Sequence, residues 1–204
     1  MKNLKNVLAL LVFLFCITLQ AQKKEIAAAF SSSYEAEAAK KYESAIATIN
    51  TVYDANSYEM NLRLGWLNYL AGKNKESISY YQKAATIMPA ATEPKWAIIT
   101  VYTKLENWVD IEKTYLSILK LDSKNATANY NLGLIYYYRK NYVEAKKFFD
   151  VSLNQTPFGY DYLLMSAWTN YFLGNKSNAS ILFNKVLLYA PNDASALEGL
   201  GLIK

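Results

Sequence analysis

Residues 126–159, ATANYNLGLIYYYRKNYVEAKKFFDVSLNQTPFG, decide the fold of this 204-residue chain. Apolar side chains recur at helical spacing in two stretches of about 13 residues each, which is long enough for two helices. A short polar break joins the stretches, and Pro157 follows the second, where it ends the pairing before the next helix. The segment therefore predicts a pair of antiparallel helices.

The same pattern recurs along the chain at a constant interval. Pro191 follows Pro157 by one step of 34 in the numbering, and Pro157 follows Pro89 by two such steps. Counting each proline as position 32 gives four blocks without insertions, namely 58–91, 92–125, 126–159 and 160–193. A fixed period of this length is typical of repeat architectures, in which one helix pair buries its apolar face against its neighbours.

Glycines keep the same register as the prolines. Leucine–glycine pairs occupy positions 7 and 8, and single glycines occupy position 15. These residues are Leu64-Gly65, Leu132-Gly133 and Leu200-Gly201, together with Gly72 and Gly174. Glycine at position 15 suits a helix end that needs a positive φ, and a small residue at position 8 lets paired helices approach closely.

This register resembles that of the tetratricopeptide repeat family. Within 126–159 the resemblance is carried by Leu132, Gly133, Tyr136, Tyr142, Ala145, Phe149 and Pro157. It covers about residues 26–204 and implies an all-α fold, a right-handed superhelical solenoid of antiparallel helix pairs. It divides the solenoid, residues 22–204, into an irregular first pair (26–57), the four blocks above and a C-terminal capping helix (194–204).

Two parts of the chain depart from the family pattern. Block 92–125 has Ile99 and Ile111 at positions 8 and 20, which are normally small. Overfilling such a contact costs roughly 1–3 kcal/mol unless the backbone moves, so we expect a wider spacing between helices 92–104 and 109–121. In the first pair, we expect the first helix at 25–40 and a linker that is slightly short.

The first 21 residues have the layout of a secretory signal. Lys2 and Lys5 precede an apolar run at 7–19, and a small residue, Ala21, follows. This arrangement predicts cleavage after Ala21. A membrane-spanning helix needs about 20 apolar residues, and this run is shorter. An uncleaved membrane anchor is therefore the alternative to a cleaved signal.

Lipid anchoring through Cys16 is not supported by its neighbours. Bacterial lipoprotein signals resemble one another in a small residue before the cysteine, whereas Phe15 precedes Cys16 here. A mature chain without cysteine suits an oxidising compartment. We therefore expect an exported bacterial protein, periplasmic or secreted, with no membrane span in the mature chain.

The composition argues against several classes of function. The chain has no histidine, so it has no Ser-His-Asp or Cys-His catalytic unit and no imidazole metal site. Its basic residues are scattered and form no stripe that would favour nucleic acid, and no pair of acids suggests a glycosidase cleft. We expect a protein that is not an enzyme, with no catalytic residue, metal or cofactor.

The resemblance also implies where a partner binds. In the family the concave groove is lined by the first helix of each pair, and many of the matching positions are aromatic here. The predicted groove residues are Trp66, Tyr69, Trp96, Tyr130, Tyr137, Tyr138, Trp168, Tyr171 and Phe172. Aromatic residues at positions 5 and 12 are also common packing residues in the family, so packing is the alternative role. A continuous aromatic surface in water marks a binding site.

We therefore expect a non-catalytic protein–protein interaction scaffold that binds an apolar or aromatic-containing peptide or protein segment. Positions 5 and 9 lack the lysine and asparagine with which some family members clamp acidic tails. A glycan- or cell-wall-binding module using the same groove is the alternative, because tryptophan and tyrosine also stack on sugars. The apolar C-terminal helix, with Leu197, Leu200 and Ile203, leaves self-association open.

Overall fold

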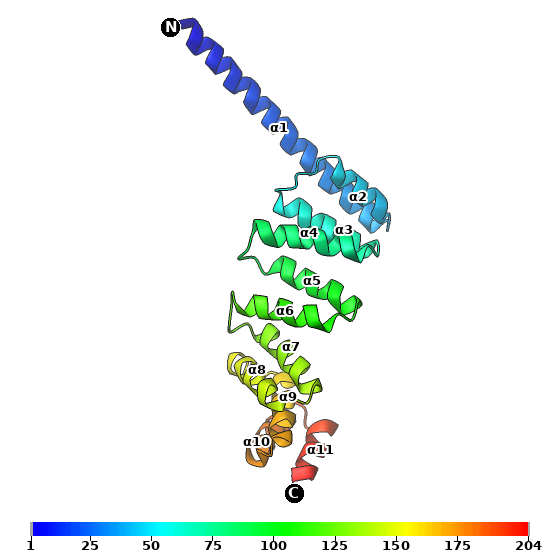
Figure 1. Cartoon of the computed structure of the whole chain (residues 1–204), viewed down its shortest axis with the longest axis vertical. Coiled ribbons are helices and arrows are strands. Elements are labelled where there is room, and N and C mark those ends of the chain that lie inside the picture. Colours follow the sequence, from blue (N-terminus) through cyan, green and yellow to red (C-terminus); the bar gives the residue numbers. More distant parts are fainter. Residues whose placement is uncertain (1, 204) are drawn as a thin grey trace. The chain divides into compact units, whose positions relative to one another are not determined.

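The structure is a computed structural model that describes residues 2–203, with side chains described for 20–203 (Figure 1). These residues form eleven α-helices and no strand. The helices are α1 (Lys2–Ala38), α2 (Tyr42–Asn50), α3 (Tyr58–Leu70), α4 (Asn74–Ile87), α5 (Glu93–Lys104), α6 (Trp108–Leu119), α7 (Ala126–Tyr138), α8 (Tyr142–Gln155), α9 (Tyr160–Phe172), α10 (Lys176–Tyr189) and α11 (Ala194–Ile203). The predicted all-α architecture is confirmed.

Consecutive helices pack in pairs, as the repeat period predicts. The chain divides into two compact units, which we call unit 1 (Met1–Val101) and unit 2 (Tyr102–Lys204). In unit 1, α1 packs on α2 and α3 packs on α4. In unit 2, α7 packs on α8 and α9 packs on α10, while α11 lies against both α9 and α10.

The close contact within a pair is a glycine against an aromatic ring. A Cβ atom added to Gly65 would lie 2.6 Å from the ring of Tyr81, and one added to Gly133 would lie 2.5 Å from the ring of Phe149. Both rings are buried. Because such distances are shorter than real carbon–carbon contacts, position 8 must be glycine wherever the ring at position 24 lies this close.

The turn inside each pair needs one residue in the left-handed region. Gly72 and Gly174 have φ of 77° at position 15, with no atom that a Cβ would meet within 4 Å. Lys40, Glu106 and Lys140 take φ of 57°, 53° and 59° at the same place in the other pairs. Five turns thus share one backbone conformation, which favours glycine.

Polar side chains at position 4 hold the loops that connect successive pairs. Asn61 Nδ2 donates to the carbonyl oxygens of Ala55 and Ser57, at 3.0 and 2.7 Å. Asn129 Nδ2 donates to the carbonyls at the same two offsets, and so does Lys95 Nζ. The carbonyls of Ser57 and Asn125 also accept the backbone N–H of Asn61 and Asn129, so the side chains add a second link between each loop and the helix that follows it.

The first pair differs from its expected limits. The first helix was expected to begin at Glu25, and this is wrong, because α1 is continuous from Lys2. The step from the turn at Lys40 to the turn at Gly72 is shorter than the step between the later turns, and α2 has 9 residues where α4 has 14. The missing residues therefore belong to the second helix and not to the linker.

Two further expectations concern the last helix and the block 92–125. The last expected helix forms α11, which buries Ala196 and Gly199, the latter against the ring of Phe183, and its capping role stays a prediction. Gly201, at position 8, has no atom within 4 Å of an added Cβ. The expected wide spacing between 92–104 and 109–121 concerns helices on either side of the division between units and stays a prediction.

In the part of the chain whose side chains are described, no helix is both long enough and apolar enough to cross a membrane. Side chains 1–19 of the predicted signal segment lie outside that part. The signal segment therefore stays a prediction.

The ring-on-glycine contact can be tested with two alanine substitutions in unit 2. We expect Gly133→Ala to lower the free energy of unfolding by about 1–3 kcal/mol, because the buried Phe149 ring cannot move aside. Gly201→Ala is the matched control, since its Cβ meets nothing and alanine favours a helix by up to about 1 kcal/mol. Urea unfolding followed by circular dichroism measures both. Equal effects of the two substitutions would contradict the packing argument.

Candidate functional site

Five of the predicted groove residues come together in unit 2. We call Tyr137, Tyr138, Tyr142, Trp168, Tyr171 and Phe172 the aromatic cluster; only Tyr142 is not a predicted groove residue. Tyr137 contacts Tyr138 and Phe172 with ring centroids 5.6 and 6.0 Å apart. Phe172 in turn stacks on Tyr142 at 4.7 Å and on Trp168 at 6.0 Å. The ends of α7 and α9 thus share one continuous set of rings.

The aromatic cluster has an exposed part and an anchored part. Tyr138 is 76% exposed and Phe172 is 46% exposed. Trp168 is half-buried, lies 5.0 Å from the ring of Phe183, and its Nε1 donates to Ser195 Oγ at 2.8 Å. Tyr138 and Phe172 are therefore available to a partner, while Trp168 also holds α11 in place.

Tyr130 is a packing residue. Its ring lies between Phe149 of α8 and Tyr162 of α9, at 5.7 and 5.0 Å. Burial raises the pKa of Tyr130 to about 12, and burial does the same for Tyr137. Both phenols therefore stay protonated under ordinary conditions, and Tyr130 serves the contact between helices.

A pocket of about 650 Å³ lies beside the exposed Tyr138 in unit 2. Its wall includes the apolar Leu134, Ile135 and Ile111, and Trp108, which is 54% exposed. Trp108 begins α6, a second helix of a pair. The sequence analysis missed it because the family's groove positions lie on first helices only.

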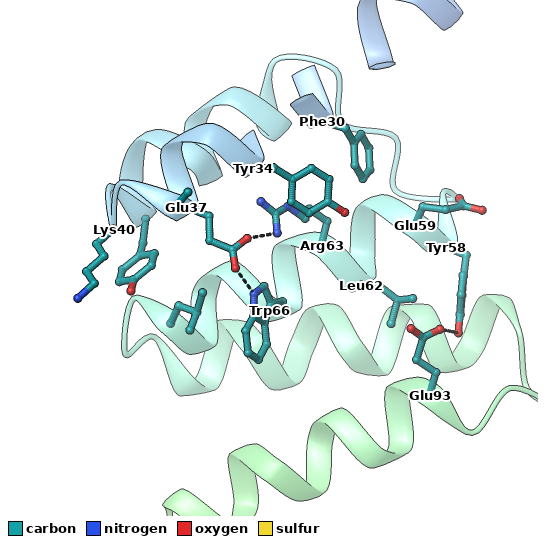
Figure 2. Close-up of a pocket in the computed structure, with 13 residues that line it drawn as sticks. Phe30, Tyr34, Glu37, Lys40, Tyr58, Glu59, Leu62, Arg63, Trp66 and Glu93 are labelled. Carbon is teal, nitrogen blue, oxygen red and sulfur yellow. Dashed lines mark hydrogen bonds and ion pairs between the residues drawn. The ribbon is translucent and has the colours of Figure 1, made fainter. Parts of the chain in front are cut away.

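Unit 1 has a larger pocket, of about 960 Å³ (Figure 2). Trp66 and Leu62 of α3 contribute to it from groove positions 9 and 5, and α1 contributes Phe30, Tyr34 and Glu37. The remaining lining residues are Ala38, Lys40, Tyr42, Tyr58, Glu59, Arg63, Leu70 and Glu93. Of the predicted groove residues in unit 1, Trp66 therefore lines this pocket.

The other predicted groove residues of unit 1 do not line this pocket. The ring of Tyr69 lies 5.7 Å from that of Trp66, and Tyr69 is half-buried. Trp96, on α5, is half-buried, and its carbonyl accepts from the Thr100 hydroxyl. Neither residue is among those that line the hollow.

A polar network crosses from α1 to α3 in this pocket. Glu37 accepts from Arg63 Nη1 and, at 2.7 Å, from Trp66 Nε1, as Figure 2 shows. Arg63 Nε also donates to the buried Ser33 Oγ at 3.0 Å, and its guanidinium lies 3.9 Å from the centre of the Tyr34 ring. The Arg63 side chain is only 5% exposed, so Glu37 neutralises a buried charge.

The pKa of Glu37 reflects this network. Burial acts to raise the pKa of this carboxyl, but the hydrogen bonds from Trp66 and Arg63 and the charge of Arg63 outweigh it, so the pKa is lowered. A carboxyl with a lowered pKa stabilises the fold above its unfolded pKa, and this contribution disappears as the pH falls through the folded value.

Sequence reasoning missed Tyr34, Glu37 and Arg63. Glu37 and Tyr34 belong to a helix whose limits could not be drawn from the pattern. Arg63 offered one usable signal, since it is one of two arginines in a lysine-rich chain. The other, Arg139, pairs in a similar way: Glu112 accepts from Arg139 Nη1 at 2.6 Å and from the Tyr136 hydroxyl at 2.8 Å.

Among the described residues there is no group of three or more acidic, cysteine or histidine side chains that could hold a metal ion. The arrangement in both units is instead one of aromatic surface beside open pockets. Such a surface can bind a segment of another molecule by burying its rings.

Known proteins share this architecture. A model of the tetratricopeptide repeat family matches residues 22–92, which include the irregular first pair and the block after it. A solved tetratricopeptide repeat protein from Parabacteroides merdae superposes with a TM-score of 0.69 at 20% identity, covering 88% of this chain and 72% of that one. Over residues 22–92 the chain is therefore similar to the tetratricopeptide repeat family, and its helix pairs have the fold of solved members of that family.

Other solved structures show the same fold. YrrB, described as a tetratricopeptide repeat protein with an unusual peptide-binding site, gives a TM-score of 0.64 at 17% identity, covering 90% of this chain and 96% of that one. MamA gives 0.66 at 17% identity, covering 84% and 95%. Identities this low show the fold of this chain and not its partner. A comparison with curated protein sequences gives no match.

The network around Arg63 makes a stability prediction. We expect Glu37→Gln to cost about 2–3 kcal/mol at pH 7, because Arg63 remains buried without its counter-charge. Glu112→Gln is the matched control and should cost less than about 1 kcal/mol, since its partner Arg139 is 46% exposed. Urea unfolding measures both losses.

The difference between the wild type and Glu37→Gln should also shrink as the pH falls below the ordinary glutamate pKa of 4.5. Equal losses for the two variants, or a difference that grows in acid, would show that Glu37 does not act through Arg63.

Proposed function

We propose that this protein is a non-catalytic protein–protein interaction scaffold that binds an apolar or aromatic-containing segment on the aromatic cluster. The observation that carries the proposal is the exposure of Tyr138 and Phe172 at the ends of α7 and α9, next to an open pocket. Both residues hold groove positions on first helices.

Leaving such apolar rings exposed to water is unfavourable, so a partner that covers them is favoured. Tyr138 and Phe172 belong to one connected set of rings through Tyr137, so a partner that covers one also covers its neighbours. Large, stiff aromatic side chains give much contact area for little loss of conformational entropy. The pocket of about 650 Å³ beside Tyr138 offers room for an apolar side chain of the partner.

A neighbour of the same fold supports a peptide as the partner. YrrB is described as having a peptide-binding site. The family and its fold support an interaction role in general. The apolar or aromatic character of the proposed partner segment is inferred from the side chains of this chain alone. We propose no catalytic residue.

The test uses exposed residues, so that the fold survives. We expect Tyr138→Ala combined with Phe172→Ala to retain the circular dichroism spectrum and to reduce recovery of crosslinked partners from the native host at least about tenfold, because each buried anchor contributes of order 1 kcal/mol or more. Trp168 is left intact because it holds α11. The matched control is Phe158→Ala with Tyr189→Ala, an equally exposed pair of rings in unit 2. Unchanged recovery, or equal loss in the control, would refute the proposal.

Glycan binding remains the alternative use of the same surface. Sugars stack on the open face of an aromatic ring. Phe172 already stacks on Tyr142 and Trp168, so few ring faces are free for a sugar. The experiment that separates the two is a titration of tryptophan fluorescence with cell-wall oligosaccharides, to which a protein-binding surface gives no response.

We also propose that the protein is exported and cleaved after Ala21. The residues of α1 that pack in unit 1, Ile26, Ala29, Phe30, Ser33 and Ala36, all follow the proposed cut, so cleavage would leave the first pair intact. N-terminal sequencing of the protein from the extracytoplasmic fraction should begin at Gln22. A chain that begins at Met1, or that stays with the cytoplasmic fraction, would refute export.

A further inference from the structure

The pocket of unit 1 has a charge distribution that the aromatic cluster lacks. Three glutamates and two basic residues line it. Glu37 and Arg63 neutralise each other in the network described above. Of the remaining charges, Glu59 and Glu93 lie at one end and Lys40 at the opposite end (Figure 2). One end of the pocket is therefore acidic.

The two carboxylates at this end are held in place but not neutralised. Glu93 Oε2 accepts from the Tyr58 hydroxyl at 3.0 Å, and Glu59 Oε2 accepts from Ser57 Oγ at 3.0 Å. Neither carboxylate forms an ion pair with any residue that the structure describes. Each keeps an oxygen, Oε1, to which no described residue donates a hydrogen bond.

The surface next to the acidic end is apolar and aromatic. Leu62 lies between Trp66 and the Tyr58–Glu93 pair in Figure 2. Trp66 is 40% exposed, and its Nε1 is already engaged by Glu37, so its ring is fixed in orientation. A hydrocarbon stem can lie on these side chains while its charged end reaches the carboxylates.

We propose that the acidic end of this pocket binds the side chain of a lysine or arginine in a partner segment, with its hydrocarbon stem on Leu62 and Trp66. The inference rests on the proposed scaffold function only in that the partner is a protein segment. Charge complementarity selects this occupant, because two carboxylates without counter-ions repel an acidic segment and attract a cation. Tyr58 and Trp66 add aromatic rings, near which cations bind favourably.

Tyr58 keeps one of these carboxylates in a fixed position. Burial and the neighbouring Glu93 raise the pKa of Tyr58 to about 12, so its hydroxyl stays protonated and continues to donate to Glu93. A carboxylate that is already held by a hydrogen bond loses little conformational freedom when a cation binds to its other oxygen. The acidic end is therefore arranged for binding before the partner arrives.

The test uses three end-blocked hexapeptides of leucine and alanine that differ only at one central residue. This residue is lysine in the first peptide, glutamine in the second and glutamate in the third. Binding is followed by the NMR signal of the Trp66 indole N–H, assigned by its loss in Trp66→Phe. We expect the lysine peptide to bind about tenfold more tightly than the glutamine peptide, and the glutamate peptide more weakly than both.

The decisive variant is Glu93→Gln, which keeps an acceptor for Tyr58 but removes the charge. It should reduce the affinity for the lysine peptide about fivefold to tenfold and leave the glutamine peptide unchanged. Glu76→Gln is the matched control, because Glu76 also lies in the first turn of a helix of unit 1, is exposed and does not line the pocket. It should leave all three affinities unchanged.

Three outcomes would overturn the proposal: equal binding of the lysine and glutamine peptides, an equal effect of Glu93→Gln on both, or no shift of the Trp66 signal with any peptide. These outcomes are distinct from failure of the scaffold function. That function depends on Tyr138 and Phe172 in unit 2, where the Glu93 variant changes nothing.

Discussion

The rest of the structure depends on one contact, an aromatic ring pressed against a residue without a side chain. The rings of Tyr81 and Phe149 occupy the space that a Cβ of Gly65 or Gly133 would fill. A contact this close fixes both the distance between two helices and their register along their axes, because a shift of one residue would place a side chain under the ring. The contact is present in blocks 58–91 and 126–159, at the same positions of each block.

This constraint also determines what the first helices show to the outside. With position 8 turned inward against the partner helix, positions 9 and 13 of α3, α7 and α9 point away from that contact, because they are about 100° and 140° further around the helix. Trp66, Tyr138 and Phe172 occupy these positions, and all three are at least 40% exposed. Tyr138 and Phe172 thus remain partly exposed after the pairs have packed, whereas Trp66 and Trp168 also donate hydrogen bonds to Glu37 and Ser195.

The helix pairs and some residues of the candidate site could be predicted from the sequence. The other residues could not, for a physical reason. Prolines, glycines and small residues mark the contacts inside a pair, so the repeats could be predicted from them. The positions that face away from those contacts could be predicted from the same register. Tyr34, Glu37 and Arg63 could not, because their association joins α1 to α3 across about 30 residues and follows no period. The role of Tyr130 could not be predicted either, because an aromatic residue at its position suits a groove and a packing contact equally well. The structure places its ring next to those of Phe149 and Tyr162.

One block departs from this packing rule. Positions 8 and 20 are small in three of the blocks, as Gly133 and Ala145 illustrate, but they are Ile99 and Ile111 in block 92–125. Both isoleucines are buried, so their bulk lies inside the structure and not in solvent. A repeat array is held together by the contacts inside each pair and between neighbouring pairs, and small residues at positions 8 and 20 are what allow the closest of these contacts elsewhere in the chain. The boundary between the units, at Val101 and Tyr102, falls inside this block.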